Sequence, residues 1–125
     1  MAVNVKKLGN YYEKECCKIF AEKGFWVHLL AYNTAGQPCD IVAAQSCQTI
    51  LIDVKHCSSK TFSFNNIQPN QHSTFNLASE KHLTCGFAIY NDELGWKWLD
   101  YDYVSFNKHK NSVKLEELVD LDICF

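Results

Sequence analysis

The chain has 125 residues, of which 47% are hydrophobic and 21% are charged, and its formal net charge at pH 7 is −2. This length suits a single domain, residues 1–125, with a true hydrophobic core, and the composition excludes collagen-like, low-complexity and disordered chains. The twelve basic residues are all lysines, so any contact with a polyanion must rely on lysine charges, backbone N–H groups and helix N-termini, without guanidinium.

The seven cysteines form an odd set with no C-x-x-C pair, which argues against a zinc knuckle. Several of them lie within apolar runs, where cysteine acts as a small core residue. The first seven residues have no long apolar run, and no segment of the chain approaches membrane length. We therefore expect free thiols, a reducing cytoplasmic compartment and no membrane partner.

Residues 10–23 have the spacing of an amphipathic helix. Its apolar positions follow the i, i+4, i+7, i+8 pattern, at Tyr12, Cys16, Ile19 and Phe20. Asn10 is placed to cap the helix, and Gly24 is placed to end it. Glu13 has two interpretations: a capping-box residue that points to water, or a carboxylate that leans from this helix toward acids elsewhere in the fold.

Residues 25–32 are predicted to form the first strand, and a polar loop over 33–37 leads to a hairpin. The two strands of the hairpin, 38–44 and 49–55, flank a polar link at 45–48. Residues two apart on a strand share a face, so Asp53 and Lys55 project together, away from the face of Ile50, Ile52 and Val54. Asp40 begins the partner strand and is expected to converge with Asp53.

Two carboxylates that converge on one sheet edge repel each other. Both stay ionised only if a cation compensates, and otherwise they share a proton. A divalent metal ion is the interpretation that we favour for Asp40 and Asp53. The alternative is an accident of an edge strand, because Asp-x-Lys after an apolar run is common in proteins.

Residues 61–64 alternate briefly between polar and aromatic side chains and could add an edge strand. A helix is predicted from Pro69, because proline suits the first turn of a helix. Phe75, Leu77 and Ala78 offer the apolar side of this helix. Gln71 lies in its first turn, where the helix N-terminus favours anions. Gln71 is therefore either an ordinary exposed glutamine or a residue of an anion site.

The remaining chain predicts a buried strand at 84–90, a turn at 91–95, a return strand at 96–101 and a short helix at 114–119. The aromatic residues Trp96, Trp98, Tyr101 and Tyr103 are interpreted as packing and edge cover, with a base-stacking surface as the less favoured alternative. The element order is helix, three strands, helix, two strands, which predicts an α/β fold with a mixed sheet.

The pattern of Asp40, a hairpin and Asp53-Val54-Lys55 resembles the core of the PD-(D/E)xK nuclease superfamily. The resemblance implies a restriction-endonuclease-like core of order αβββαβ, here with an extra C-terminal strand and a short helix. Residues 9–27 are similar to the start of archaeal-type Holliday junction resolvases. Residues 62–71 resemble the segment after the catalytic lysine in RecU-type resolvases of Gram-positive bacteria and their phages.

Carried over position by position, the resemblance implies that Asp40, Asp53 and the Val54 carbonyl bind Mg²⁺, with Mn²⁺ as a substitute. It further implies that Lys55 is the catalytic lysine, that Glu13 is the acid of the first helix, and that Gln71 belongs to the site. The implied activity is a metal-dependent endonuclease that makes paired nicks in four-way junctions. Paired nicks need two active sites, so a homodimer bound to branched DNA is expected.

The sequence departs from the resolvase pattern in three places. Asp53 replaces the commoner Glu, Cys39 stands where Pro often precedes the first acid, and the basic residue that often follows the first strand is absent, with His28 nearby. Two alternatives therefore stay open. One is a flap or branched-DNA nuclease of the VRR-NUC type, and the other is a catalytically inactive DNA-binding protein of the same fold.

Overall fold

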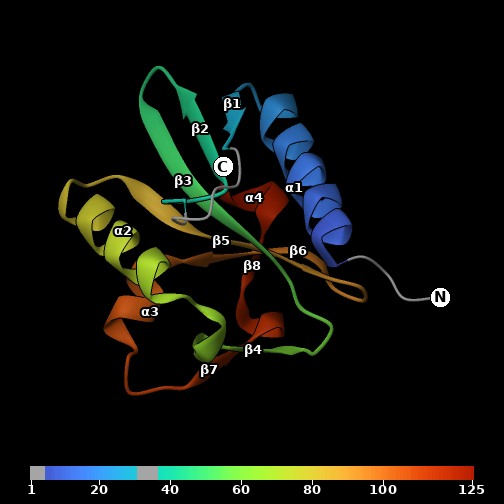
Figure 1. The fold of residues 1–125 in the computed structure, drawn as a ribbon, viewed down its shortest axis with the longest axis vertical. Coiled ribbons are helices and arrows are strands. Elements are labelled where there is room, and N and C mark those ends of the chain that lie inside the picture. The colour runs from blue at the N-terminus through green and yellow to red at the C-terminus, as the bar shows by residue number, and fades with distance from the viewer. Residues whose placement is uncertain (1–4, 31–36) are drawn as a thin grey trace.

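The computed structural model describes residues 5–30 and 37–125 (Figure 1). Its helices are α1 (Val5–Glu22), α2 (Pro69–Glu80), α3 (Tyr101–Phe106) and α4 (Leu121–Cys124). Its strands are β1 (Trp26–Leu29), β2 (Ile41–Gln45), β3 (Gln48–His56), β4 (Thr61–Ser63), β5 (Thr84–Asn91), β6 (Gly95–Asp100), β7 (Ser112–Lys114) and β8 (Val119–Asp120). Two short 3₁₀ turns occupy Phe64–Asn66 and Leu115–Glu117.

One mixed sheet of six strands runs through the molecule in the order β1-β2-β3-β5-β6-β8. Strands β3 and β5 are parallel, and every other neighbouring pair in this sheet is antiparallel. A parallel pair needs a crossover connection, which here passes through β4 and α2. The predicted α/β class, mixed sheet and αβββαβ order are therefore confirmed, with β4 inserted after the third strand.

Each face of the sheet has its own core. Helices α1 and α4 cover one face, which buries side chains of alternate strand positions such as Ile41, Ile50 and Ile52. Helices α2 and α3 cover the other face, where Phe75 and Phe87 are fully buried. Figure 1 shows α1 and α2 on opposite sides of β3. Because strand side chains alternate, neighbouring residues of β3 serve different cores.

The helix predicted over 10–23 begins five residues earlier, at Val5, and ends at Glu22. Cys16 and Phe20 are fully buried, as the apolar spacing predicts. Asn10 lies inside the helix, so the prediction that it caps the helix is wrong. Gly24 has φ +92°, a left-handed conformation that glycine adopts without strain, and it ends the helix as expected. Residues 31 and 32 of the predicted first strand, and 33–36 of the predicted loop, lie outside the described residues.

Three further predictions need correction. Strand β4 does not join the main sheet but pairs with β7 in a separate two-stranded sheet. The helix predicted at 114–119 is a 3₁₀ turn at Leu115–Glu117. The residues on either side of this turn pair in the short strands β7 and β8, which leaves too few residues for an α-helix. Leu77, assigned to the apolar side of α2, is 58% exposed, because only Phe75 and Ala78 of that helix are buried.

The cysteines of the chain are all free thiols, and Cys16, Cys39, Cys57 and Cys85 are buried. Among the described residues, no helix has both the length and the apolarity that crossing a membrane requires.

At Gly86 the neighbouring strand β6 approaches too closely to leave room for a side chain. A Cβ atom built on it would lie 2.4 Å from the Leu99 carbonyl oxygen and 2.8 Å from the Trp98 side chain. We predict that Gly86→Ala lowers the free energy of unfolding by about 2 kcal/mol or more, because an overpacked core must shift its backbone. Urea unfolding measures this, with the exposed Glu80→Ala as the control. A loss below about 0.5 kcal/mol, the range of ordinary surface changes, would contradict the packing described here.

Candidate active site

The hairpin register places the two acids of the predicted site face to face. Ile41 pairs with Ile52 in the antiparallel ladder, and the Asp40 N–H donates to the Ile52 carbonyl at 3.0 Å. The regular pairing ends at Ile41 and Ile52, and Asp40 and Asp53 directly follow this last pair on the two strands. The charge of Asp40 helps to raise the pKa of Asp53, so the two carboxyl groups lie close together.

The Asp40 carboxylate is held by two hydrogen bonds. The Val54 N–H donates to Oδ2 at 2.7 Å, and the Gln37 side-chain amide donates to Oδ1 at 2.6 Å. The first bond ties Asp40 to the strand that carries Asp53. The second comes from Gln37, a residue that the sequence did not single out. Its only sequence signal is a polar amide three residues before an acid, which is too common to interpret without the fold.

Asp53 is a buried carboxyl group, with 3% of the residue exposed. Burial, and next the charge of Asp40, raise the pKa of Asp53 to about 8, and Lys55 opposes this shift. The Lys55 Nζ lies 3.1 Å from Asp53 Oδ2. The Lys55 ammonium thus offsets part of the negative charge at Asp53.

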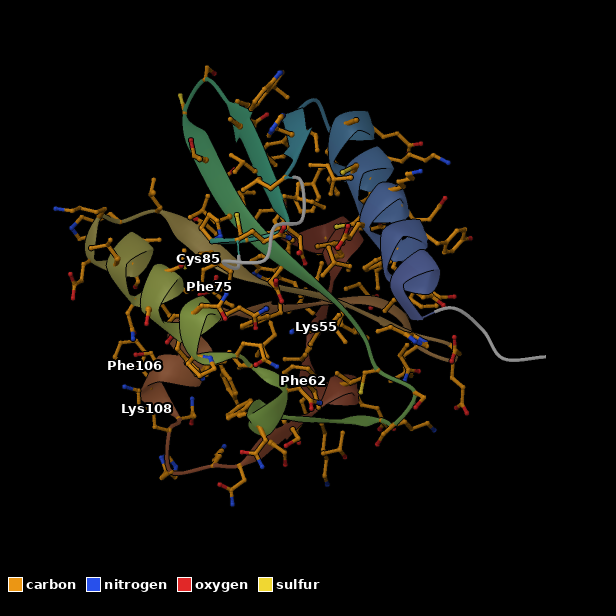
Figure 2. The ribbon with its side chains drawn as sticks, in the orientation of Figure 1. Lys55, Phe62, Phe75, Cys85, Phe106 and Lys108 are labelled. Carbon is orange, nitrogen blue, oxygen red and sulfur yellow. The ribbon has the colours of Figure 1, made fainter. Side chains whose placement is uncertain are left out.

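Lys55 also connects the sheet to α2. Its Nζ donates to Gln71 Oε1 at 3.2 Å, and the same oxygen accepts from the Gln68 backbone N–H at 2.9 Å. Gln71 is therefore fixed by the start of α2 and presented to the lysine. Asn70 in the same turn donates to the Gln37 carbonyl at 3.3 Å. Figure 2 marks Lys55 on β3 near the middle of the molecule.

Glu13 comes from α1, and the structure favours the second of its two interpretations. It is half-buried, and its pKa is raised to about 7, first by burial and then by the charge of Asp40. The helix begins at Val5, so Glu13 is too far along it to serve as a capping-box residue. Elements from both sides of the sheet thus bring Glu13, Asp40, Asp53, Lys55 and Gln71 to one region.

The donor set fits a hard divalent cation. Gln37 Oε1 is buried and accepts no hydrogen bond from the described part of the protein, and the buried Asp53 Oδ2 has the Lys55 ammonium, 3.1 Å away, as its partner. Carboxylate, amide and backbone carbonyl oxygens are the ligands that Mg²⁺ prefers, together with water. Among the described residues, no three His, Cys, Asp or Glu side chains gather into a ligand cluster. With Asp40 and Asp53 as its ligands, an ion would have two protein carboxylates, and water would complete its coordination.

The fold is shared with a solved nuclease structure. Hjc from Archaeoglobus fulgidus, a Holliday junction resolvase from an archaeal hyperthermophile, superposes with a TM-score of 0.72 and 15% sequence identity. The match covers 90% of this chain and 96% of that chain. No family model and no curated protein sequence matches the chain. At this identity the likeness establishes the fold, and it confirms the predicted resemblance at that level.

We predict that Asp53→Asn stabilises the metal-free protein, because it removes a buried carboxyl group that faces Asp40. A carboxyl whose pKa rises on folding costs stability once it ionises. The advantage of Asn is therefore absent below about pH 4, the ordinary pKa of Asp, and it grows with pH. It levels off above the folded pKa of about 8. At pH 8 the gain should be about 1 kcal/mol or more, the equivalent of one pKa unit.

Thermal unfolding in EDTA at pH 4, 6 and 8 measures this difference. The exposed Asp122→Asn on α4 is the control for loss of a carboxylate. Mg²⁺ or Mn²⁺ should then raise the unfolding temperature of the wild type and leave that of Asp53→Asn unchanged, because only a folded site binds the ion. A variant that is less stable at pH 8 than the wild type would contradict the electrostatic description of Asp53.

Proposed function

We propose that this protein is a divalent-metal-dependent DNA endonuclease whose main substrate is the four-way junction, which it resolves by paired nicks. The observation that carries the proposal is the pair of opposed acids, Asp40 and Asp53, with the Lys55 ammonium 3.1 Å from the buried one. This arrangement stands in the fold of a junction resolvase. Fold alone does not fix chemistry, so the side chains of the site have to support it.

Asp40 and Asp53 would hold the cation, Mg²⁺ or Mn²⁺, with the Val54 carbonyl as the third protein ligand. Val54 is suited to this position because its own N–H already holds Asp40 at 2.7 Å. When bound, such an ion lowers the pKa of water and offsets negative charge on the phosphate. Asp53 has one methylene fewer than the Glu more common in this position, and its burial on β3 keeps the shorter side chain in a fixed place.

Lys55 and Gln71 would act on the water and the phosphate. Gln71 holds the Lys55 ammonium at 3.2 Å, so the positive charge is oriented before substrate arrives. A preorganised charge beside the scissile phosphate stabilises the oxygens that become more negative in the transition state. In-line attack by water forms one P–O bond while the bond to O3′ breaks, and it leaves a 5′-phosphate and a 3′-hydroxyl.

Glu13 would exchange protons in this reaction. Its pKa of about 7 allows both protonation states at neutral pH, which suits a group that takes up the proton of the attacking water. It comes from α1, on the opposite side of β3 from Gln71. The proposed machinery therefore depends on both helices being packed on the sheet.

Junction resolution requires two sites that face strands of matched polarity, which a two-fold dimer provides. Of the aromatic residues, Phe62, Trp98 and Tyr101 are each less than 10% exposed and belong to the cores, so they are not open to a partner. The strongly exposed apolar side chains of the described residues that remain for a dimer include Leu77, Phe106, Val119 and Ile123.

The test of this function is a panel of end-labelled DNA substrates with Mg²⁺ or Mn²⁺: a four-way junction, a 5′-flap and a linear duplex. We predict paired nicks in the junction, little cutting of the duplex, and a homodimer by sedimentation at micromolar protein. Equal cutting of flaps by a monomer would favour the flap-nuclease alternative. Binding of the junction without cutting and without metal binding would favour the inactive DNA-binding alternative.

We predict that Lys55→Ala slows nicking by about a hundredfold or more, the usual effect of losing one preorganised charge, and leaves metal affinity within about threefold. The reason is that a charged lysine has no lone pair to offer the metal. Single-turnover cleavage gives the rate and calorimetry gives the metal affinity. Lys60→Ala, an exposed lysine paired with Glu93 at 3.2 Å, is the matched control. Loss of metal binding in a folded Lys55→Ala protein would assign Lys55 a structural role.

A further inference from the structure

Strand β1 carries an exposed pair of aromatic rings. Trp26 is 63% exposed, and its ring is stacked on that of His28, with centroids 5.8 Å apart and planes 5° apart. A large indole left open to solvent is unusual, because aromatic rings normally supply core packing. Here the imidazole of His28, itself exposed, supports the indole in one orientation.

The sheet register places this pair on the face that carries the active site. Phe25, Val27 and Leu29 pack toward α1, so the alternate residues Trp26 and His28 project to the opposite face. The ladder confirms this, because His28 pairs with Val42 and Val42 with Leu51, both of which pack on the α2 side. Asp53 is two residues beyond Leu51, and therefore it projects to the same side.

The separation along the sheet follows from the register. Trp26, Ala44 and Thr49 form one row across three strands, and Asp40 and Asp53 are each four residues further along the two hairpin strands. At 3.4 Å per residue this is about 14 Å along the strands. The spacing of about 4.8 Å between neighbouring strands brings the distance from Trp26 to about 14–17 Å, the length of about four to five stacked nucleotides of one strand. Figure 1 shows β1 and the tip of the β2–β3 hairpin extending beyond α2 in this view.

The side chains across the sheet from the Trp26–His28 pair are small: Ala44 lies opposite Trp26, Val42 lies opposite His28, and Thr49 lies beyond Ala44. Thr49 also lines a hollow of about 610 Å³ at the end of the hairpin. Most of the other side chains that line this hollow are polar, among them Gln45, Gln48 and Thr84, with Leu83 as an apolar member. An interface with a second protein copy needs an apolar centre around its aromatic anchor. A nucleotide needs only a flat ring on which its base can stack, with hydrogen-bonding groups nearby for its phosphate.

We propose that Trp26, supported by His28, stacks on a base of the DNA strand about four to five nucleotides from the phosphate that is cut. This inference rests on the proposed function and adds a substrate contact to it. Stacking on an aromatic ring tolerates any base and strengthens binding by about tenfold or more per base. It suits a chain of net charge −2 without arginine, because the contact needs no positive charge.

Stacking and phosphate contacts differ in their response to salt, and this difference defines the test. We predict that Trp26→Ala weakens binding of a four-way junction in EDTA by about tenfold, while the slope of log affinity against log salt stays unchanged. Trp26→Phe should retain most of the affinity, because it keeps a flat ring. Tyr11→Ala, which removes an aromatic ring that is 56% exposed on α1, the helix that covers the opposite face of the sheet, should bind as the wild type does.

A second readout locates the contact. Junctions that carry 2-aminopurine one to six nucleotides from the cut site should lose fluorescence when wild-type protein binds, most strongly near positions four to five, and should not do so with Trp26→Ala. Unchanged affinity of a folded Trp26→Ala protein, or a changed salt slope, would overturn the proposal. Dissociation of the homodimer by Trp26→Ala would assign the pair to an interface between copies instead.

These binding experiments contain no metal, so they stand apart from the test of nicking. If the wild type binds the junction through Trp26 but does not cut it with Mg²⁺, the proposed nuclease function fails and the stacking contact stands. If the wild type cuts the junction and Trp26→Ala binds it normally, the stacking contact fails and the nuclease function stands.

Discussion

The structure depends on the opposition of two carboxyl groups across the β2–β3 hairpin. Asp40 and Asp53 directly follow the last pair of the hairpin ladder and act on each other, and the core holds Asp53 almost entirely away from water. Like charges in such a place are unfavourable, and the protein compensates with one ammonium, that of Lys55, and raised pKa values at Asp53 and Glu13. A sheet built for stability alone would place apolar residues here. Buried charged groups that lower the stability of a fold are expected at functional sites.

The rest of the fold positions groups around this pair. Helix α2 presents Gln71 to Lys55 and connects Asn70 to the loop of Gln37, while α1 brings Glu13 from the other side. Asn91, 1% exposed, fixes the chain that leaves the active-site strand: its amide donates to the carbonyls of Cys57 and Ser59. The segment between Lys55 and α2 is therefore anchored at its beginning and at its end.

The sequence predicted those parts of the fold that depend on periodicity. The hairpin, the first helix and the shared face of Asp53 and Lys55 follow from spacings of two and 3.6 residues, and the structure has them. Gln37 was missed because its role arises from a contact with Asp40 that no periodicity encodes. The elements after β6 were not predicted correctly, because β7, β8, α3 and α4 are too short to show a periodic spacing of apolar residues. The exposure of Leu77 depends on where α3 and the sheet end, which is a tertiary property.

The central claim, that Asp40 and Asp53 together hold a divalent ion, is tested most directly by crystals of the protein grown with Mn²⁺. The account predicts one anomalous difference peak per chain at coordination distance, about 2.1 Å for an ion of the Mg²⁺ type, from an oxygen of each carboxylate. Asp53→Asn crystals should lack the peak. A peak that touches neither acid, or its absence at saturating Mn²⁺ with both carboxylates in place, would contradict the account.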